Sequence, residues 1–512
     1  MSYTVGVSSG MFMTASQEEK PQFLTIPRKI FRGGLEGVDF TQLDIESITE
    51  FKEPDLKKET EKIRNLGIRF GVHGESYAMG GGEKPMGLLD SAIETDYIHS
   101  HDRLMKHIEG CGMIGAEYVN VHPSETTPFL KLTMQLQPTK LVDPWGRSFK
   151  EFFEENPKLL DWVIEEDNDF LWEFLRTTAK SLINRNIQDR RDRYILREKK
   201  EPDMKKIEEE VKEEVKTFFV EQISTPELAY GAEKAAYYII AKWMMNNNDP
   251  LWKNMVGKKI SDKDLRDEHA KWVPAVSAKY IYGHFKPKDT KKFPDPLKVL
   301  EKNKLYFVFE AQMGTSGLEG LQRLVRPIDM IHLCEAIDSP WVVVCIDFEH
   351  ILSQNLDPKK EVEEIPRGKG KFVKVLHLGF PTPHTPAHMP LDVGSREQLY
   401  LYEIIYELRQ RGFKEGFLIF ERGAAARGTS LLAIKKIKEF LEKETPPGEL
   451  PIEFYGMSEE DFRVKKQQVA ITDHALDPLK DVLTVPEEEF TFLSSEAVKK
   501  GKREEWLRRR YR

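Results

Sequence analysis

The chain is poor in the features that mark secreted, membrane-embedded and nucleic-acid-coating proteins. It has three cysteines in 512 residues, too few for a disulfide framework or a four-cysteine zinc site, so a reducing, cytoplasmic location is expected. No apolar run approaches the ~18–20 residues of a membrane-spanning helix, which excludes an integral membrane protein. The net charge of −8 argues against the broad basic surface typical of proteins that bind bulk nucleic acid.

Short apolar runs recur along the chain, and most are followed by a helical pattern. They are rich in β-branched and aromatic residues and almost continuously apolar, as are parallel strands buried on both faces. They lie at 68–73, 117–122, 305–310, 341–347, 372–377 and 417–421, after a weaker candidate at 39–46. Alternating strands and helices predict βα units, eight of which close into a (β/α)8 TIM barrel of the α/β class.

The strand and helix alternation is interrupted between residues 127 and 302. This stretch is charged and helix-like, and it holds six of the eight tryptophans. We therefore expect a barrel in two parts, 1–126 and 303–445, with a helical insertion at 127–302 after the third predicted strand. Residues 446–512 are expected to form a C-terminal extension. A Trp-rich helical insertion is also a candidate surface for a protein partner.

Polar residues stand at the ends of the apolar runs. The carboxyl ends of barrel strands meet on one face, and a buried charge there must be paired or must bind a metal ion. Histidines and carboxylates together suit zinc or manganese. The predicted set is His73, His122, Glu310, Asp347, His377 and Glu421.

Other histidines fall into two groups. His350 follows Asp347 by three residues, and His384 and His388 lie in a Pro-rich loop after His377, so all three are candidates for further metal coordination. The remaining ones are expected on solvated faces; they include His99, His101, His107 and His284.

The ordered motifs resemble those of the endonuclease IV family, zinc enzymes of the xylose-isomerase-like TIM barrel superfamily that cut DNA at abasic sites. The resemblance covers about 60–126 and 303–430, and its most specific element is an Asp and a His three residues apart after a Cys. The matching segments are HGESY (73–77), HPSE (122–125), FEAQMGTSG (309–317), CIDFEH (345–350), HLGF (377–380) and FERG (420–423).

The resemblance implies two or three zinc ions, with Mn2+ or Mg2+ as alternatives. One ion would be held by His73, His122 and Glu310. Glu310 would bridge to a second ion, whose other ligands would be Asp347, His377 and Glu421. A third would take His350 and His388. The family's remaining ligand for that ion is an Asp, which is Pro386 here, leaving His384 and Asp392 as substitutes.

The implied function is a metal-dependent phosphodiesterase that hydrolyses abasic or otherwise damaged DNA through a metal-bound hydroxide, with Glu310 as the catalytic carboxylate. One alternative is a single-metal sugar or sugar-phosphate isomerase or epimerase of the same superfamily. Its ligand quartet would be Glu310, Asp347, His377 and Glu421. A second alternative is a non-catalytic metal-binding component of a larger complex.

Overall fold

The computed structural model describes most of the predicted barrel and insertion. The described residues are 2–9, 25–35, 38, 40–45, 47–74, 89–124, 140–165, 179–224, 232–311, 323–379, 391–421, 427–456 and 467. The chain divides into two compact units, 1–449 and 450–512. Within the second unit, a short 3-10 helix, Ile452–Tyr455, is described. No described helix has the length and apolar character to cross a membrane.

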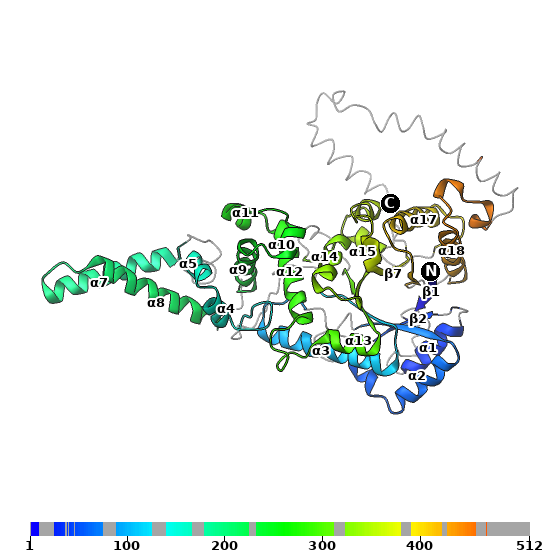
Figure 1. Cartoon of the computed structure of the whole chain (residues 1–512), viewed down its shortest axis with the longest axis horizontal. Helices are drawn as coiled ribbons and strands as arrows, with labels where there is room; N and C mark the ends of the chain where they lie inside the picture. The colour runs from blue at the N-terminus through cyan, green and yellow to red at the C-terminus, as the bar shows by residue number, and fades with distance from the viewer. Residues whose placement is uncertain are drawn as a thin grey trace, which may run out of the picture. The chain divides into compact units, whose positions relative to one another are not determined.

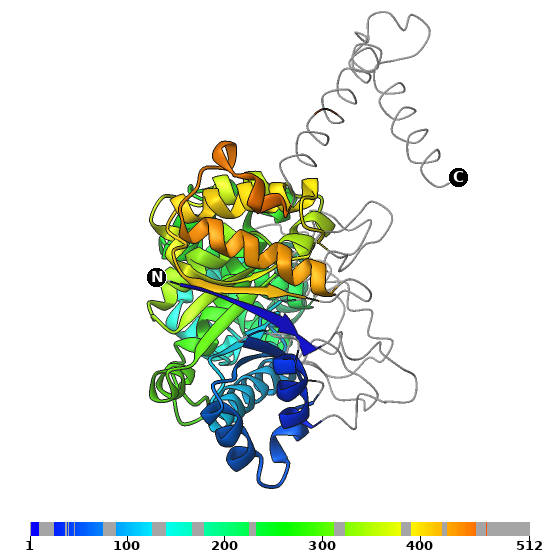
Figure 2. The same ribbon diagram turned by 90° about the vertical axis from the view of Figure 1, so that its right-hand side faces the viewer.

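Eight parallel strands close into a barrel in sequence order, which confirms the predicted TIM barrel. Figure 2 shows the closure, where β1 lies beside β8. The strands are short and largely buried; all six residues of β6 are buried, as expected for a parallel sheet covered by helices. Their bounds are β1 (Tyr3–Ser8), β2 (Phe40–Asp44), β3 (Arg69–His73), β4 (Tyr118–Val121), β5 (Tyr306–Glu310), β6 (Val342–Asp347), β7 (Val373–His377) and β8 (Gly416–Phe420).

β1 is absent from the strands predicted from sequence, because its residues YTVGVS mix polar and small side chains with few large apolar ones. The insertion therefore follows β4, the third of the predicted strands. The weaker candidate at 39–46 is β2.

Helices follow the strands and form the outer layer of the barrel. Their ends carry the expected signals: Ser395 caps α17 by accepting a hydrogen bond from the backbone N–H of Gln398, and α3 ends at Gly115 with φ 75°. Their bounds are α1 (Ile26–Leu35), η3 (Ile48–Lys52), α2 (Leu56–Asn65), α3 (Glu94–Ile114), α14 (Pro327–Ile337), α15 (Phe348–Ser353), α16 (Pro358–Glu363), η4 (Lys369–Phe372), α17 (Arg396–Gln410), α18 (Arg427–Glu442) and η5 (Pro447–Glu449).

The segment between β4 and β5 is helical wherever it forms regular secondary structure in the described residues. α7 and α8 pack side by side as a hairpin (Figure 1). The helices are α4 (Phe149–Glu155), α5 (Pro157–Glu165), α7 (Ala179–Glu198), α8 (Met204–Ser224), α9 (Ala232–Asn246), α10 (Pro250–Met255), α11 (Asp262–Asp267), α12 (His269–Phe285) and α13 (Pro296–Asn303).

The end of this segment belongs to the barrel wall. α12 packs against α14, and the Phe285 ring lies 5.0 Å from the Phe307 ring of β5. α12 thus takes the place of the outer helix that normally connects the fourth strand of a TIM barrel to the fifth. From sequence, this helix looks like its neighbours in the insertion. The domain limits at 126, 302 and 445 stay predictions.

The barrel interior below the carboxyl ends of the strands is filled by large side chains. The Tyr118 ring stacks on Phe40, and β3 makes room for it with Gly71, where a Cβ would lie 2.5 Å from the ring. This layer closes the barrel beneath the polar residues. Its buried members are Phe40, Tyr118, Val308, Val343, Cys345, Val375, Phe417 and Ile419.

Candidate metal centre

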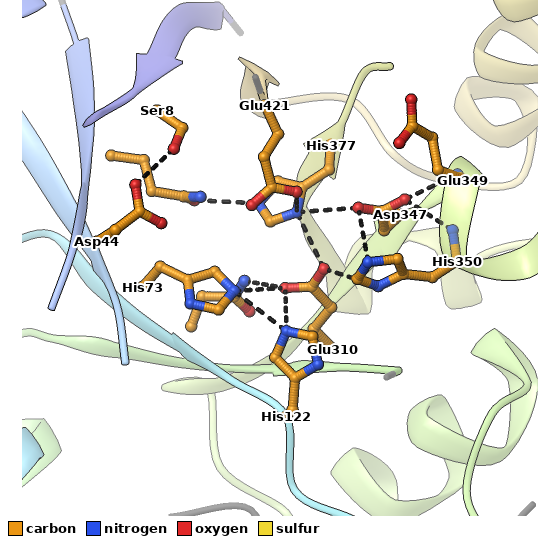
Figure 3. A network of polar contacts seen from close by, with 12 residues as sticks. Ser8, Asp44, His73, His122, Glu310, Asp347, Glu349, His350, His377 and Glu421 are labelled. Atoms are coloured by element: carbon orange, nitrogen blue, oxygen red, sulfur yellow. Dashed lines mark hydrogen bonds and ion pairs between the residues drawn. The ribbon is translucent and has the colours of Figure 1, made fainter. Parts of the chain in front are cut away.

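The polar residues at the strand ends meet on one face of the barrel. Asp347 of β6 pairs in register with His377 of β7, so these two strand ends stand level with each other. Glu310 ends β5, and Glu421 directly follows β8. This is the face on which TIM barrels carry their sites. Figure 3 shows the converging side chains of His73, His122, Glu310, Asp347, His350, His377 and Glu421.

Four of these residues surround one point. The Nδ1 atom of His377 lies 3.0 Å from Glu310 Oε1 and 3.0 Å from Glu421 Oε2. It also lies 3.4 Å from Asp347 Oδ2. One ligand atom from each of the four lies within 4.8 Å of the others. Three carboxylates crowded around a mostly buried imidazole repel one another unless a cation joins them, and this mixture of oxygen and nitrogen suits a divalent metal ion.

Two more histidines face the other oxygen of Glu310. The Nε2 atoms of His73 and His122 lie 3.3 Å and 3.6 Å from Glu310 Oε2, and 3.2 Å from each other. The Asn120 amide donates a hydrogen bond to the same oxygen. Glu310 therefore belongs to the quartet through one oxygen and faces two further side chains that can bind a metal, His73 and His122, through the other. The role of Glu310 as a bridge between two ions stays a prediction, as does the number of ions.

Asp347 has two separate roles, one for each oxygen. Its Oδ1 caps α15 by accepting the backbone N–H groups of Glu349 and His350, at 2.7 Å and 2.9 Å. The start of the helix thus holds the side chain in place, while Oδ2 faces His377. The capping explains why this Asp stands directly between a strand and a helix.

His350 lies beside the quartet. Its Nδ1 is 2.8 Å from the carbonyl oxygen of Ala311 and 3.2 Å from Glu310 Oε1, and its Nε2 is 3.7 Å from Asp347 Oδ2. The rest of the proposed third site cannot be compared in the same way, because His384, Pro386 and His388 lie outside the described residues. Asp392 is described, and its Oδ1 accepts a hydrogen bond from the Thr429 hydroxyl. No candidate metal-binding group of the described residues includes Asp392.

The charges of the centre favour a cation. Burial opposes a charged ring, but hydrogen bonding and charge from Glu310 outweigh it and raise the pKa of His73 to about 9. His350 is also buried, and Asp347 and Glu310 raise its pKa to about 10. Glu310 stays ionised despite burial because the charge of His377 and a hydrogen bond from His350 hold its pKa well below the ordinary value. The carboxylates of the centre thus attract positive charge, which a divalent ion would supply.

His122 differs from its neighbours. Burial lowers its pKa to about 3, and the charge of Glu310 does not compensate. A neutral imidazole keeps a lone pair for a metal ion or for a donor on a ligand.

Sequence reasoning missed the polar side chains that lie inside the strands. Gln42 and Asn120 interrupt the apolar pattern of β2 and β4, and both are fully buried. A buried polar residue in a strand needs a hydrogen-bond partner, so this interruption was the available signal. Asp44 at the end of β2 was missed as well. It accepts hydrogen bonds from the hydroxyls of Ser8 and Ser9, at 2.6 Å and 3.2 Å.

Comparison with known proteins relates the chain to solved structures only. No protein-family model and no curated protein sequence matches it. A D-tagatose 3-epimerase-like protein shares 11% identity at a TM-score of 0.40, over 86% of this chain and 98% of that one. An L-ribulose 3-epimerase shares 10% at 0.41, over 86% and 95%. The 3-keto-D-glucoside 4-epimerase of E. coli shares 9% at 0.36, over 85% and 99%.

The predicted activity is corrected by this comparison. The likeness is one of fold, the TIM barrel, and it does not show the endonuclease IV family. The prediction of a hydrolase that cuts abasic DNA in repair is contradicted, because the solved structures that resemble the chain are sugar epimerases. Motif order misled because a Glu–Asp–His–Glu quartet at four successive strand ends fits both chemistries. The nucleic-acid partner, and a protein partner for the insertion, stay predictions.

Proposed function

We propose that the chain is a divalent-metal-dependent isomerase or epimerase that acts on a sugar or a sugar phosphate. The observation that carries this proposal is the convergence of Glu310, Asp347, His377 and Glu421 on one point at the carboxyl face of the barrel. The sugar epimerases of similar fold are consistent with this choice and are not its basis.

The quartet would hold the metal ion. Glu310 and Glu421 approach His377 Nδ1 from different strands, each at 3.0 Å, and Asp347 presents the oxygen that its helix cap leaves over. What a bound divalent ion supplies is polarisation of a carbonyl oxygen, which makes the neighbouring C–H more acidic. The metal identity in this proposal is Mn2+, Mg2+ or Zn2+, since all three accept carboxylate ligands.

The two glutamates of the quartet would have different roles, and one of them would accept the proton. Epimerisation next to a carbonyl requires a proton to leave one face of a carbon and another to arrive on the opposite face. The Glu421 side chain is 13% exposed, whereas that of Glu310 is fully buried, so Glu421 is the carboxylate that a substrate can reach. Glu421 is therefore the proposed proton acceptor. Glu310 is fixed by Asn120 and His377 and would act mainly in binding and orientation.

The test is solvent deuterium exchange. Full-length protein is loaded with Mn2+, Mg2+, Co2+ or Zn2+ and incubated in D2O with a panel of ketoses, aldoses and their phosphates. NMR then follows deuterium uptake at carbons next to the carbonyl, together with formation of the epimer or isomer. We expect metal-dependent exchange on at least one substrate and its loss in Glu421→Gln. Glu335→Gln is the matched control, because Glu335 lies on α14 and pairs with His332 outside the centre.

Fully loaded protein that exchanges no proton of any sugar in the panel would contradict the proposal. Metal analysis of the same samples gives the number of ions. One equivalent agrees with the quartet alone, and two equivalents would place a second ion at His73, His122 and Glu310.

A further inference from the structure

Gln42 lies beneath the metal centre, on β2, with its side chain fully buried. Its Oε1 atom accepts a hydrogen bond from the Tyr118 hydroxyl at 2.7 Å. The same atom lies 3.0 Å from Nε2 of His377, on the side of the ring that faces away from the quartet. One amide oxygen therefore meets both a phenol and the histidine at the middle of the proposed ligand set.

This contact assigns the protons of His377. An amide oxygen only accepts hydrogen bonds, so Nε2 of His377 must carry a hydrogen and donate it. When a metal ion replaces the proton that faces the carboxylates, the ring is neutral and keeps one hydrogen, the one on Nε2, so that Nδ1 has a lone pair. That nitrogen is the one facing Glu310 and Glu421 at 3.0 Å. A metal ligand must be an unprotonated nitrogen, so the tautomer that Gln42 selects is the one that the quartet needs.

Tyr118 fixes the orientation of the amide. If the Gln42 amide were turned over, its NH2 group would point at Nε2 of His377 and at the Tyr118 hydroxyl. The phenol proton would then lose the acceptor that it has in the structure, because a hydroxyl that faces an NH2 group can only accept from it. The Tyr118 ring is itself held by stacking on Phe40 and by the space that Gly71 leaves. The packed Tyr118 ring thus fixes the orientation of the Gln42 amide, and the amide fixes which nitrogen of His377 carries the proton.

We propose that Gln42 is a positioning residue of the metal centre, which holds the Nε2 proton of His377 and so presents Nδ1 to the metal ion. The proposal rests on the proposed function, since it requires the quartet to bind a metal. Such a partner hydrogen-bonds to the second nitrogen of a metal-bound histidine. Its removal lowers metal affinity about 10–100-fold.

The experiment measures the dissociation constants of Mn2+ and Zn2+ for full-length variants. Gln42→Met keeps the length and removes the acceptor, and we expect affinity to fall about 10–100-fold. Gln42→Glu restores an acceptor and should bind metal within a few-fold of wild type, which a merely structural role would not predict. Gln398→Met is the control: Gln398 is an equally buried glutamine on α17 that accepts from Gly394 instead, so its loss should leave metal affinity unchanged.

A second readout follows the tautomer itself. In 15N-histidine-labelled, zinc-loaded protein, the His377 signals, assigned with His377→Asn, should show a protonated Nε2 in wild type and Gln42→Glu. Weakened or mixed signals are expected in Gln42→Met. Should Gln42→Met fail to fold, Gln42→Asn withdraws the acceptor by one methylene and tests the same contact.

The outcomes separate the two proposals. If wild type binds no metal, or if Asp347→Asn and Glu421→Gln bind it as well as wild type, the metal quartet of the proposed function fails. If the quartet variants lose metal while Gln42→Met and Gln42→Asn bind it as tightly as wild type, the role of Gln42 is overturned and the quartet stands.

Discussion

Two groups of buried histidines in this molecule carry opposite charge tendencies. At the metal centre, His73 and His350 face carboxylates, and their pKa values rise to about 9 and about 10. Between α3 and α12, His101 and His284 stack with ring centroids 5.4 Å apart and Nδ1 atoms 3.2 Å apart. Burial lowers the pKa of His101 to about 4, and that of His284 well below its ordinary value.

The comparison shows that burial alone makes a histidine neutral and that a hydrogen-bonded carboxylate reverses the effect at His73 and His350. His284 is fully buried and stacks on Tyr97 at 4.0 Å, and His101 bonds to the carbonyl oxygen of Pro294. These contacts are those of packing. The expectation that His101, His107 and His284 lie on solvated faces is wrong, because all three are buried. His101 of α3 packs against His284 of α12, and His107 packs against Phe51.

The largest effect is expected from removing the carboxylate that defines the centre. Glu310→Gln keeps the shape of the side chain but removes the charge shared by His73, His350 and His377. Metal affinity should fall by more than the ~100-fold seen for outer partners of metal ligands, and activity should fall with it. Elemental analysis after dialysis, with Glu335→Gln as the control, measures this. A Glu310→Gln protein that still binds its full complement of metal would contradict the distinction between the histidines of the metal centre and the packed histidines.

The second-largest effect is expected at the packed histidines, His101 and His284. His284→Ala opens a cavity beside Tyr97 and His101, and the free energy of unfolding should fall by about 2–4 kcal/mol. Metal affinity should stay unchanged, because α12 supplies none of the four ligands. Chemical denaturation of the metal-loaded protein measures the first quantity, and metal titration measures the second. Loss of metal without loss of stability would reverse the assignment of the two groups.

The pH dependence of stability sharpens the comparison further. His101 and His284 have lower pKa values folded than unfolded, so as pH falls the unfolded chain takes up protons first. Their contribution to the free energy of unfolding is fully present above about pH 6.5, which is the pKa of histidine in the unfolded chain, and it is lost as the pH falls toward 4. In this range, the free energy of unfolding should change by about 1.4 kcal/mol per pH unit for each histidine. His284→Phe should flatten this slope. Denaturation curves from pH 7.5 to 4.5 measure this, and an unchanged slope in the variant would contradict it.

The smallest effect concerns His122, which lies at the centre and yet has a lowered pKa like the packing group. It is not a member of the quartet, so His122→Asn should change the affinity of the first metal ion by less than tenfold, which is less than the loss expected for an outer partner of a metal ligand. Calorimetric titration of the variant and wild type measures this. A variant that loses the first ion would move His122 into the primary ligand set.

Sequence patterns predicted the barrel and most of its strands because buried parallel strands are short, apolar and β-branched, as VVVCID of β6 is. They also placed Glu310, Asp347, His377 and Glu421 together, since strand ends of a barrel share one face. β1 was not predicted because YTVGVS lacks that pattern. The predicted nuclease activity was wrong because motif order carries no information on which bonds the centre can reach.

The sequence by itself determined the fold class and the convergence of the quartet, because both follow from local periodicity and from the geometry of a closed parallel sheet. Only the tertiary structure decided the rest. It brought Gln42 of β2 under His377 of β7, 335 positions further along the chain. It also set α12 into the barrel wall and buried His101 and His284. These contacts join segments far apart in the chain, and no local pattern encodes which side chains will meet across a closed barrel.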